Sequence, residues 1–64
     1  MGAKELAEFI EDCLQEPVEA GGCGTERGGV YVHRLEKDIG DCIIDGHADI
    51  VVLAEKILAK LGKS

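Results

Sequence analysis

The sequence predicts a small two-layer α+β fold with the element order helix, strand, strand, helix. Three observations lead to it: an amphipathic stretch at residues 3–15, two β-rich stretches at 30–35 and 41–45 with a short polar turn between them, and a second amphipathic stretch from about 47 to 61. Strands joined by so short a link pair antiparallel. We therefore expect one small domain over residues 1–64, in which an antiparallel hairpin packs against two helices.

The first helix is predicted by a single apolar stripe. Its members recur at the spacing of one helical face: Leu6, Phe9, Ile10, Cys13 and Leu14. Pro17 ends the helix, because a residue before proline is pushed out of the α region. Acids near that end, Glu11 among them, oppose the helix dipole. Either solvent screens them, or a base such as Arg27 or Arg34 lies close to them.

The second helix is predicted by its caps and its spacing. Asp45 or Gly46 is the expected N-cap, and Gly62 supplies a C-terminal stop. The apolar residues that we expect to face the core are Ile50, Leu53, Ala54, Ile57, Leu58 and Leu61.

Two strands alone make a poorly stable sheet. The free edges of the hairpin invite pairing with a second copy of the chain. A core built from so few residues also favours oligomerisation. We therefore expect a homodimer, with a four-stranded sheet running across it.

The charge is placed unevenly along the chain. The net charge is −6, and residues 1–26 account for all of it, with seven acids against Lys4. Such a surface repels phosphate, so we expect no nucleic acid partner. A basic protein surface is the partner that this charge favours.

Three cysteines and no secretion signal at the start of the sequence indicate a reducing compartment. We expect a cytoplasmic protein with free thiols. No stretch has the roughly 18–20 apolar residues of a membrane span, so we expect no membrane partner.

The most unusual segment is residues 20–29, which read AGGCGTERGG. Clustered glycine is costly in folding entropy and offers no side chain to pack. Either the segment is a flexible loop, or its backbone approaches something closely. It precedes a strand and lacks the lysine of a P-loop, so it is not a nucleotide loop of that type.

Glycine neighbours would leave the Cys23 thiol open to attack. Arg27 would lower the pKa of this thiol, whereas the acidic Glu26 would oppose that effect. Cys23, Gly24 and Arg27 are therefore the candidate ligand-binding or reactive residues of this loop.

Thiols and imidazoles also raise the possibility of a metal site. Cys23, His33, Cys42 and His47 could converge if the loop folds over the hairpin, and zinc or another transition metal would suit them. Their spacing contains no close ligand pair of the kind that zinc sites usually have.

We expect an interaction module without catalysis or cofactor, whose acidic first helix meets a basic partner. A small thiol- or metal-binding protein is the alternative. Hydrolytic chemistry has little support, because the only hydroxyls are Thr25, Tyr31 and Ser64.

Overall fold

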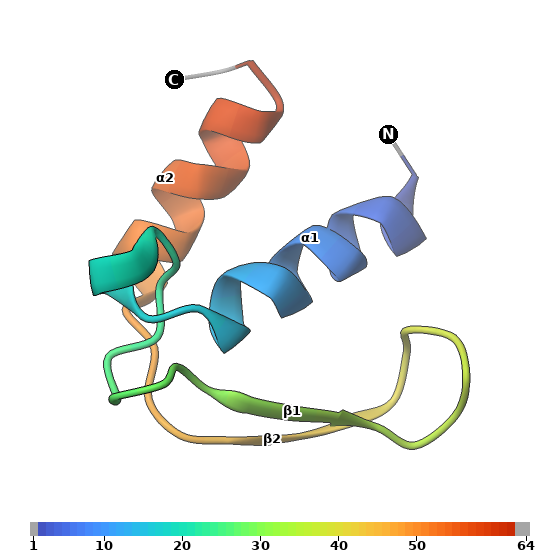
Figure 1. The fold of residues 1–64 in the computed structure, drawn as a ribbon. Coiled ribbons are helices and arrows are strands. Elements are labelled where there is room, and N and C mark those ends of the chain that lie inside the picture. Colours follow the sequence, from blue (N-terminus) through green and yellow to red (C-terminus); the bar gives the residue numbers. More distant parts are fainter. Residues whose placement is uncertain (1, 63–64) are drawn as a thin grey trace.

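The computed structural model describes residues 2–62, and these form an α+β fold with the expected element order. Helix α1 (Ala3–Gln15) is followed by a short 3-10 helix, η1 (Val18–Ala20). Strands β1 (Tyr31–Arg34) and β2 (Cys42–Asp45) form an antiparallel hairpin. Helix α2 (Ile50–Lys60) completes the fold (Figure 1). The bounds of α1 agree with the prediction.

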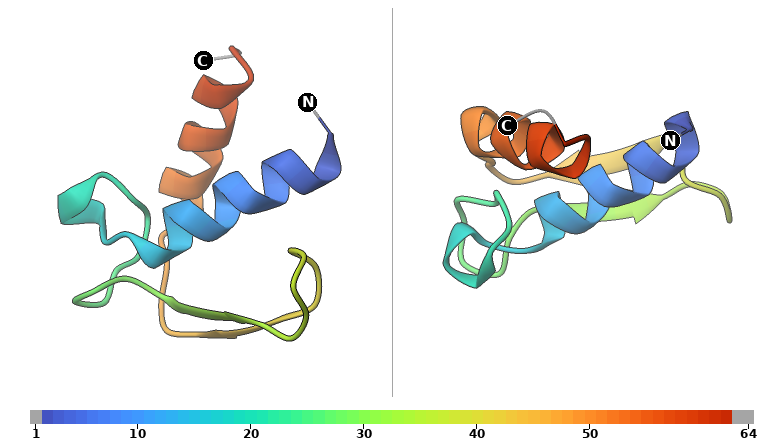
Figure 2. Two further views of the ribbon diagram at one scale, coloured as in Figure 1. Left: turned by 45° about the vertical axis from the view of Figure 1, so that its right-hand side comes forward. Right: turned by 90° about the horizontal axis from the view of Figure 1, so that it is seen from above.

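Helix α1 is the central element. It packs against β1 and also against α2, whereas α2 makes no comparable contact with either strand. The expectation that both helices cover the hairpin is therefore not met, since only α1 lies against it (Figures 1 and 2). The molecule is thin as a result, with principal extents of 32 × 30 × 15 Å.

The core is small and lies where α1, the glycine-rich segment and the start of β1 meet. Its buried residues are Cys13, Leu14, Cys23 and Val30, and partly buried side chains around it include Phe9, Ile10, Val32 and Leu53.

Helix α2 begins later than the sequence predicted. Asp49, not Asp45 or Gly46, is the N-cap, and its carboxylate accepts hydrogen bonds from the N–H groups of Val51 and Val52 at 3.0 and 3.1 Å. The residues just before it are used differently, because the His47 carbonyl accepts a hydrogen bond from the Thr25 N–H at 2.8 Å. The chain is thus tied to the glycine-rich segment before the helix starts.

The apolar stripe of α2 also differs from the expectation. Leu53 packs against the core, but Ile50, Leu58 and Leu61 keep 67%, 45% and 43% of their surface exposed. The physical reason is that α2 touches α1 and not the hairpin, so α1 covers only a narrow band of the α2 surface.

Candidate functional site

The glycine-rich segment caps the C-terminal end of α1. A helix leaves its last carbonyl groups without partners inside the helix. Here the N–H of Cys23 donates to the carbonyl of Cys13 at 2.9 Å, that of Gly24 to Glu16 at 3.0 Å, and that of Val30 to Leu14 at 2.7 Å. The segment therefore supplies backbone donors to the carbonyl groups that α1 leaves open.

This contact explains why the segment is rich in glycine. A Cβ atom on Gly22 would clash with the Glu16 backbone, and one on Gly29 with the Gln15 carbonyl. A Cβ on Gly24 would lie 2.7 Å from the Gly29 Cα and 3.1 Å from the Leu14 carbonyl oxygen. Of the two alternatives that the sequence left open, close approach of the backbone is the one observed. What it approaches is the chain's own first helix.

Cys23 lies at the centre of this contact, and the expectation of an accessible thiol is wrong. Its exposed fraction is 0%, and its Sγ lies 3.4 Å from the Cys13 carbonyl oxygen. Its carbonyl accepts a hydrogen bond from the N–H of Asp49 at 2.8 Å, which ties α2 to the same point. Burial raises the pKa of the Cys23 thiol, and likewise that of Cys13. A protonated, enclosed thiol is a weak nucleophile. Reactivity at Cys23 stays a prediction, and it would require the segment to open.

The four candidate metal ligands lie in different places. Cys23 is in the core, and His33 stacks on Tyr31 with the ring centroids 6.2 Å apart. Cys42 lines a groove of about 320 Å³ between α1 and the hairpin. Nδ1 of His47 lies 3.6 Å from a Glu26 carboxylate oxygen. Within residues 2–62, no three His, Cys, Asp or Glu side chains are grouped so that they could hold a metal ion.

Arg27 and Gly24 line a cavity of about 790 Å³ beside η1. Its wall also carries Glu19 and Glu26, so the cavity brings two carboxylates to the one guanidinium. Carboxylates repel an anionic ligand, so this cavity does not favour an anion at Arg27. Of the three candidate loop residues, only Arg27 keeps an exposed side chain.

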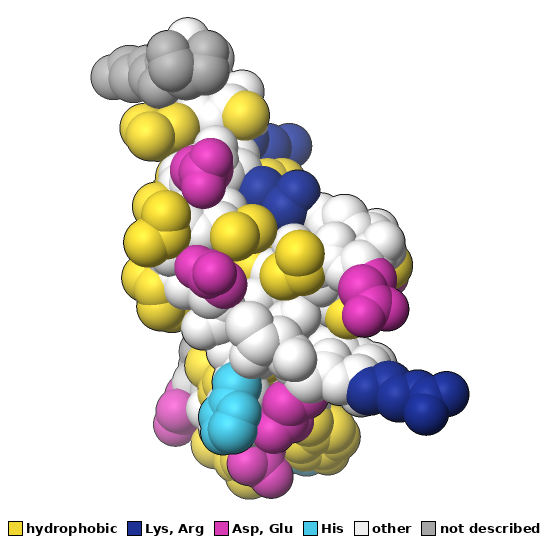
Figure 3. All heavy atoms as spheres, turned by 90° about the vertical axis from the view of Figure 1, so that its left-hand side faces the viewer, with side chains coloured by type: hydrophobic (Ala, Val, Ile, Leu, Met, Phe, Trp, Pro, Cys, Tyr) yellow, Lys and Arg dark blue, Asp and Glu magenta, His cyan; other side chains and the backbone are white. Residues whose placement is uncertain are grey.

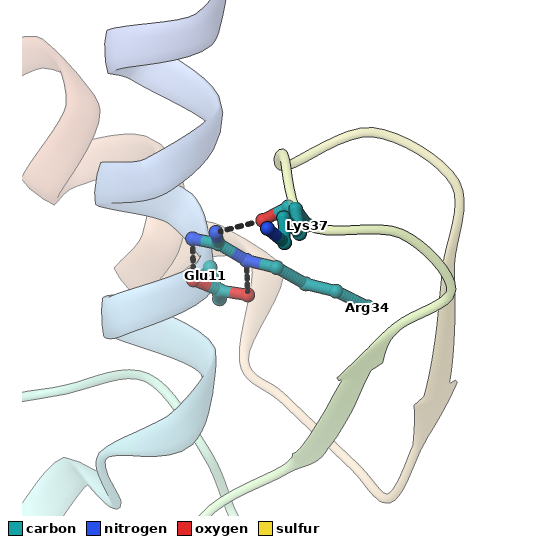
Figure 4. Close-up of polar contacts among 3 residues, drawn as sticks. All are labelled: Glu11, Arg34 and Lys37. Atoms are coloured by element: carbon teal, nitrogen blue, oxygen red, sulfur yellow. Dashed lines mark hydrogen bonds and ion pairs between the residues drawn. The ribbon is translucent and has the colours of Figure 1, made fainter.

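The acidic end of α1 has a base beside it, as one of the two open alternatives required. The guanidinium of Arg34 on β1 donates twice to the Glu11 carboxylate, from Nε at 2.9 Å and from Nη2 at 2.7 Å (Figure 4). It also donates to the Lys37 carbonyl at 3.1 Å. The hydrogen bonds to Arg34 lower the pKa of Glu11, and those to Glu11 raise the pKa of Arg34. This bidentate pair fastens the hairpin to α1, and Arg34 is the base concerned.

The other acids of α1 remain in solvent. Glu5, Glu8 and Asp12 are all exposed, and their spacing of three and four residues places them along one helical face. Within the described residues 2–62, none of the three has an ion-pair partner. We call Glu5, Glu8 and Asp12 the acidic stripe.

Sequence reasoning missed a second surface feature, the apolar side chains that the fold leaves outside. Within the described part of the chain, nine large hydrophobic residues are exposed against four that form the buried core. The exposed set includes Ile43 and Ile44 on β2 and Ile50 and Val51 on α2. The pattern of hydrophobic residues could not reveal this, because it shows which residues share a face and not whether that face is covered.

No protein-family model matches the chain, and no curated protein or solved structure matches it. In residues 2–62, neither helix has the length and apolar character needed to cross a membrane.

Proposed function

We propose that the chain is a non-enzymatic interaction module, in which the acidic stripe of α1 meets a basic protein surface. The observation that supports the proposal is that only one of the acids in this part of α1 is used inside the fold. Glu11 is bound by Arg34, whereas Glu5, Glu8 and Asp12 face solvent with no ion-pair partner among residues 2–62. The stripe is therefore free to engage charges on another molecule.

Complementary charge makes such a contact specific and speeds the encounter of the partners, but it adds little to the affinity. An exposed ion pair is worth about 0–1 kcal/mol, and salt screens it. The affinity must come from apolar surface, which this fold supplies. Figure 3 shows hydrophobic side chains gathered over α2 on one face of the molecule. Ile50, Val51, Leu58 and Leu61 are the exposed large residues of that helix and its C-cap.

A second copy of the chain is the other partner that we propose. The exposed apolar side chains of β2, Ile43 and Ile44, and the thin shape of the molecule both support a homodimer, with a sheet that continues from one copy to the next.

The test of the acidic stripe compares two variants of equal charge. E5Q/E8Q/D12N removes the stripe, and E19Q/E36Q/E55Q removes three exposed acids from other parts of the surface. Each is titrated against an immobilised helical peptide rich in lysine and arginine, at ionic strengths from about 20 to 300 mM.

We expect the wild-type chain to bind with an affinity that falls as salt rises, and the stripe variant to lose most of that binding. The control variant should bind nearly as well as the wild type. Equal losses in the two variants would mean that net charge alone is responsible, and no binding at low salt would contradict the proposal.

A further inference from the structure

The hairpin has two edges, and its register shows which backbone groups point out from each. Tyr31 pairs with Asp45 and Arg34 with Cys42, so the register continues along the ladder without a bulge. The N–H of Leu35 donates to the Asp41 carbonyl at 3.1 Å, which makes this a hydrogen-bonded pair. Hydrogen-bonded and non-hydrogen-bonded pairs alternate in an antiparallel ladder.

The residues of the non-hydrogen-bonded pairs therefore point their N–H and C=O groups away from the hairpin. On the β1 edge these residues are Val32 and Arg34, and on the β2 edge they are Cys42 and Ile44. No backbone hydrogen bond outside the ladder engages the N–H of any of the four within residues 2–62. Each edge thus offers two unused donors and two unused acceptors, which is the template for adding a strand.

The two edges differ in charge and in how closely α1 packs against the strand. The β1 strand holds His33 and Arg34, and α1 packs directly against it. Pairing through β1 would bring the α1 helices of both copies, which carry the acidic stripes, toward the same seam. On β2 the charge is confined to Asp45 at the end of the strand, residues 42–44 carry none, and a groove lined by Cys42 and Ile44 separates the strand from α1. Charged residues on an edge oppose strand addition, so β2 is the edge suited to it.

We propose that a second copy of this chain pairs with the β2 edge, which rests on the homodimer proposed above and specifies its seam. The two β2 strands run antiparallel about a two-fold axis, with Ile43 opposite Ile43 of the second copy. The outward groups of Cys42 then bond to those of Ile44 of the second copy, and the reverse. The sheet has four strands in the order β1, β2, β2, β1.

This register is chosen by the side chains that it brings together. The next registers in which outward groups still face each other pair Cys42 with Cys42, or Ile44 with Ile44, and they place Ile43 opposite Asp41 or Asp45 of the second copy. Only the central register sets Ile43 against an apolar partner, and its exposed fraction of 51% leaves it free to pack there. The same register places Asp41 opposite Asp45 of the second copy at both ends of the seam, where like charges oppose pairing.

Amide hydrogen exchange read by NMR, at protein concentrations below and above the midpoint of association, tests the seam without any substitution. Sedimentation of the same samples reports the oligomeric state. We expect the amides of Cys42 and Ile44 to gain protection as the dimer forms, while those of Val32 and Arg34 exchange as before. Protection at Val32 and Arg34 instead would move the seam to β1. A dimer with none of the four protected would overturn strand pairing and leave the homodimer standing.

Oxidative cross-linking at Ile43 tests the register. With Ile43 opposite itself in a non-hydrogen-bonded pair, I43C brings two Cβ atoms about 4.5–5.5 Å apart across the seam, so mild oxidation should give a dimer linked through position 43. In the shifted registers residue 42 or residue 44 lies opposite itself instead, so a wild-type dimer linked through Cys42, or an I44C dimer linked through position 44 while I43C stays unlinked, would overturn the proposed pairing. H33C is the matched control, because His33 lies beside Ile43 within the hairpin but away from the seam, and it should give no dimer linked through position 33.

A chain that stays monomeric at every concentration would contradict the second copy as a partner altogether. Binding of the basic peptide to the acidic stripe is measured separately, so failure of the seam and failure of the proposed interaction with a basic surface are distinguishable.

Discussion

Replacing Gly22 by alanine tests the close contact between the glycine-rich segment and α1. The added Cβ would clash with the Cβ, carbonyl carbon and carbonyl oxygen of Glu16, which are fixed at the end of the helix. Gly22 has an ordinary φ, so the cost is steric alone. Forcing an extra carbon into a packed site costs about 1–3 kcal/mol. We expect the upper part of this range, about 2–3 kcal/mol, because the obstruction is mainly backbone and cannot rotate away.

The consequence for a chain of this size is large. A 64-residue domain is stable by only about 3–10 kcal/mol. Its unfolding entropy of about 130 cal/mol/K makes each kcal/mol worth about 7 °C in Tm. Gly22→Ala should therefore lower Tm by about 15–20 °C in a thermal melt followed by circular dichroism.

Gly40→Ala is the matched control for this prediction. A Cβ there has nothing within 4 Å, and its φ is ordinary. The substitution restricts the unfolded chain and should stabilise by about 0.4–1 kcal/mol, which raises Tm by about 3–7 °C. The reasoning would be refuted if both variants melted within about 2 °C of each other, because the glycine segment would then not be pressed against α1.

Three further predictions concern the thiols, pH and the cap of α2. Iodoacetamide should modify the half-buried Cys42 first and Cys23 only much later, as read by peptide mass spectrometry; equal rates would contradict the burial of Cys23. Because the pKa of Glu11 is lowered from 4.5, the unfolded chain takes up this proton before the folded chain does as pH falls. The stability that Glu11 contributes is therefore present above about pH 4.5 and is lost below it. When the urea midpoint is plotted against pH, E11Q should fall less steeply on the acid side than the wild type. An equal fall in the two proteins would argue against the Glu11–Arg34 pair. In urea unfolding, Asp49→Ala should lower the free energy of unfolding by about 1 kcal/mol, and Asp45→Ala should lower it by much less. The reverse order would indicate that Asp45 is the N-cap, as the sequence predicted.

Those elements that local physics dictates were predictable from the sequence. The stripe of α1 and the stop at Pro17 give its bounds without reference to the rest of the chain, and α1 spans Ala3–Gln15 as expected. The antiparallel hairpin also follows from two β-rich stretches and a short link. In both cases the signal lies within a dozen residues, where spacing and turn chemistry decide the outcome.

What depends on distant contacts was not predictable. The start of α2 is set by Asp49, because residues just before it bond to Thr25 and to the Gly24 region instead of continuing the helix. The burial of Cys23 arises because the segment folds back onto the end of α1. Glycine in that segment reads the same in the sequence whether the loop is mobile or tightly packed. The choice between Arg27 and Arg34 as partner of Glu11 also required the position of β1 beside α1.

The candidate site shifts for the same reason. The sequence directed attention to residues of unusual chemistry, Cys23 above all, and the fold uses that residue in its core. The surfaces that remain available are the acidic stripe on α1, the β2 edge, which is uncharged over residues 42–44, and the apolar side of α2. The acidic helix and the free hairpin edges could be anticipated from the sequence, whereas the exposure of the apolar side of α2 could not.

The central claim is that the glycine-rich segment is an ordered cap on α1, so that interaction surfaces lie elsewhere. Native-state amide hydrogen exchange tests it most directly at Cys23 and Val30, whose N–H groups donate to the carbonyls of Cys13 and Leu14. These two amides should be among the slowest to exchange, opening only with global unfolding. Exchange at Cys23 and Val30 as fast as at the exposed Arg27 would contradict the claim and show that the segment is a mobile loop.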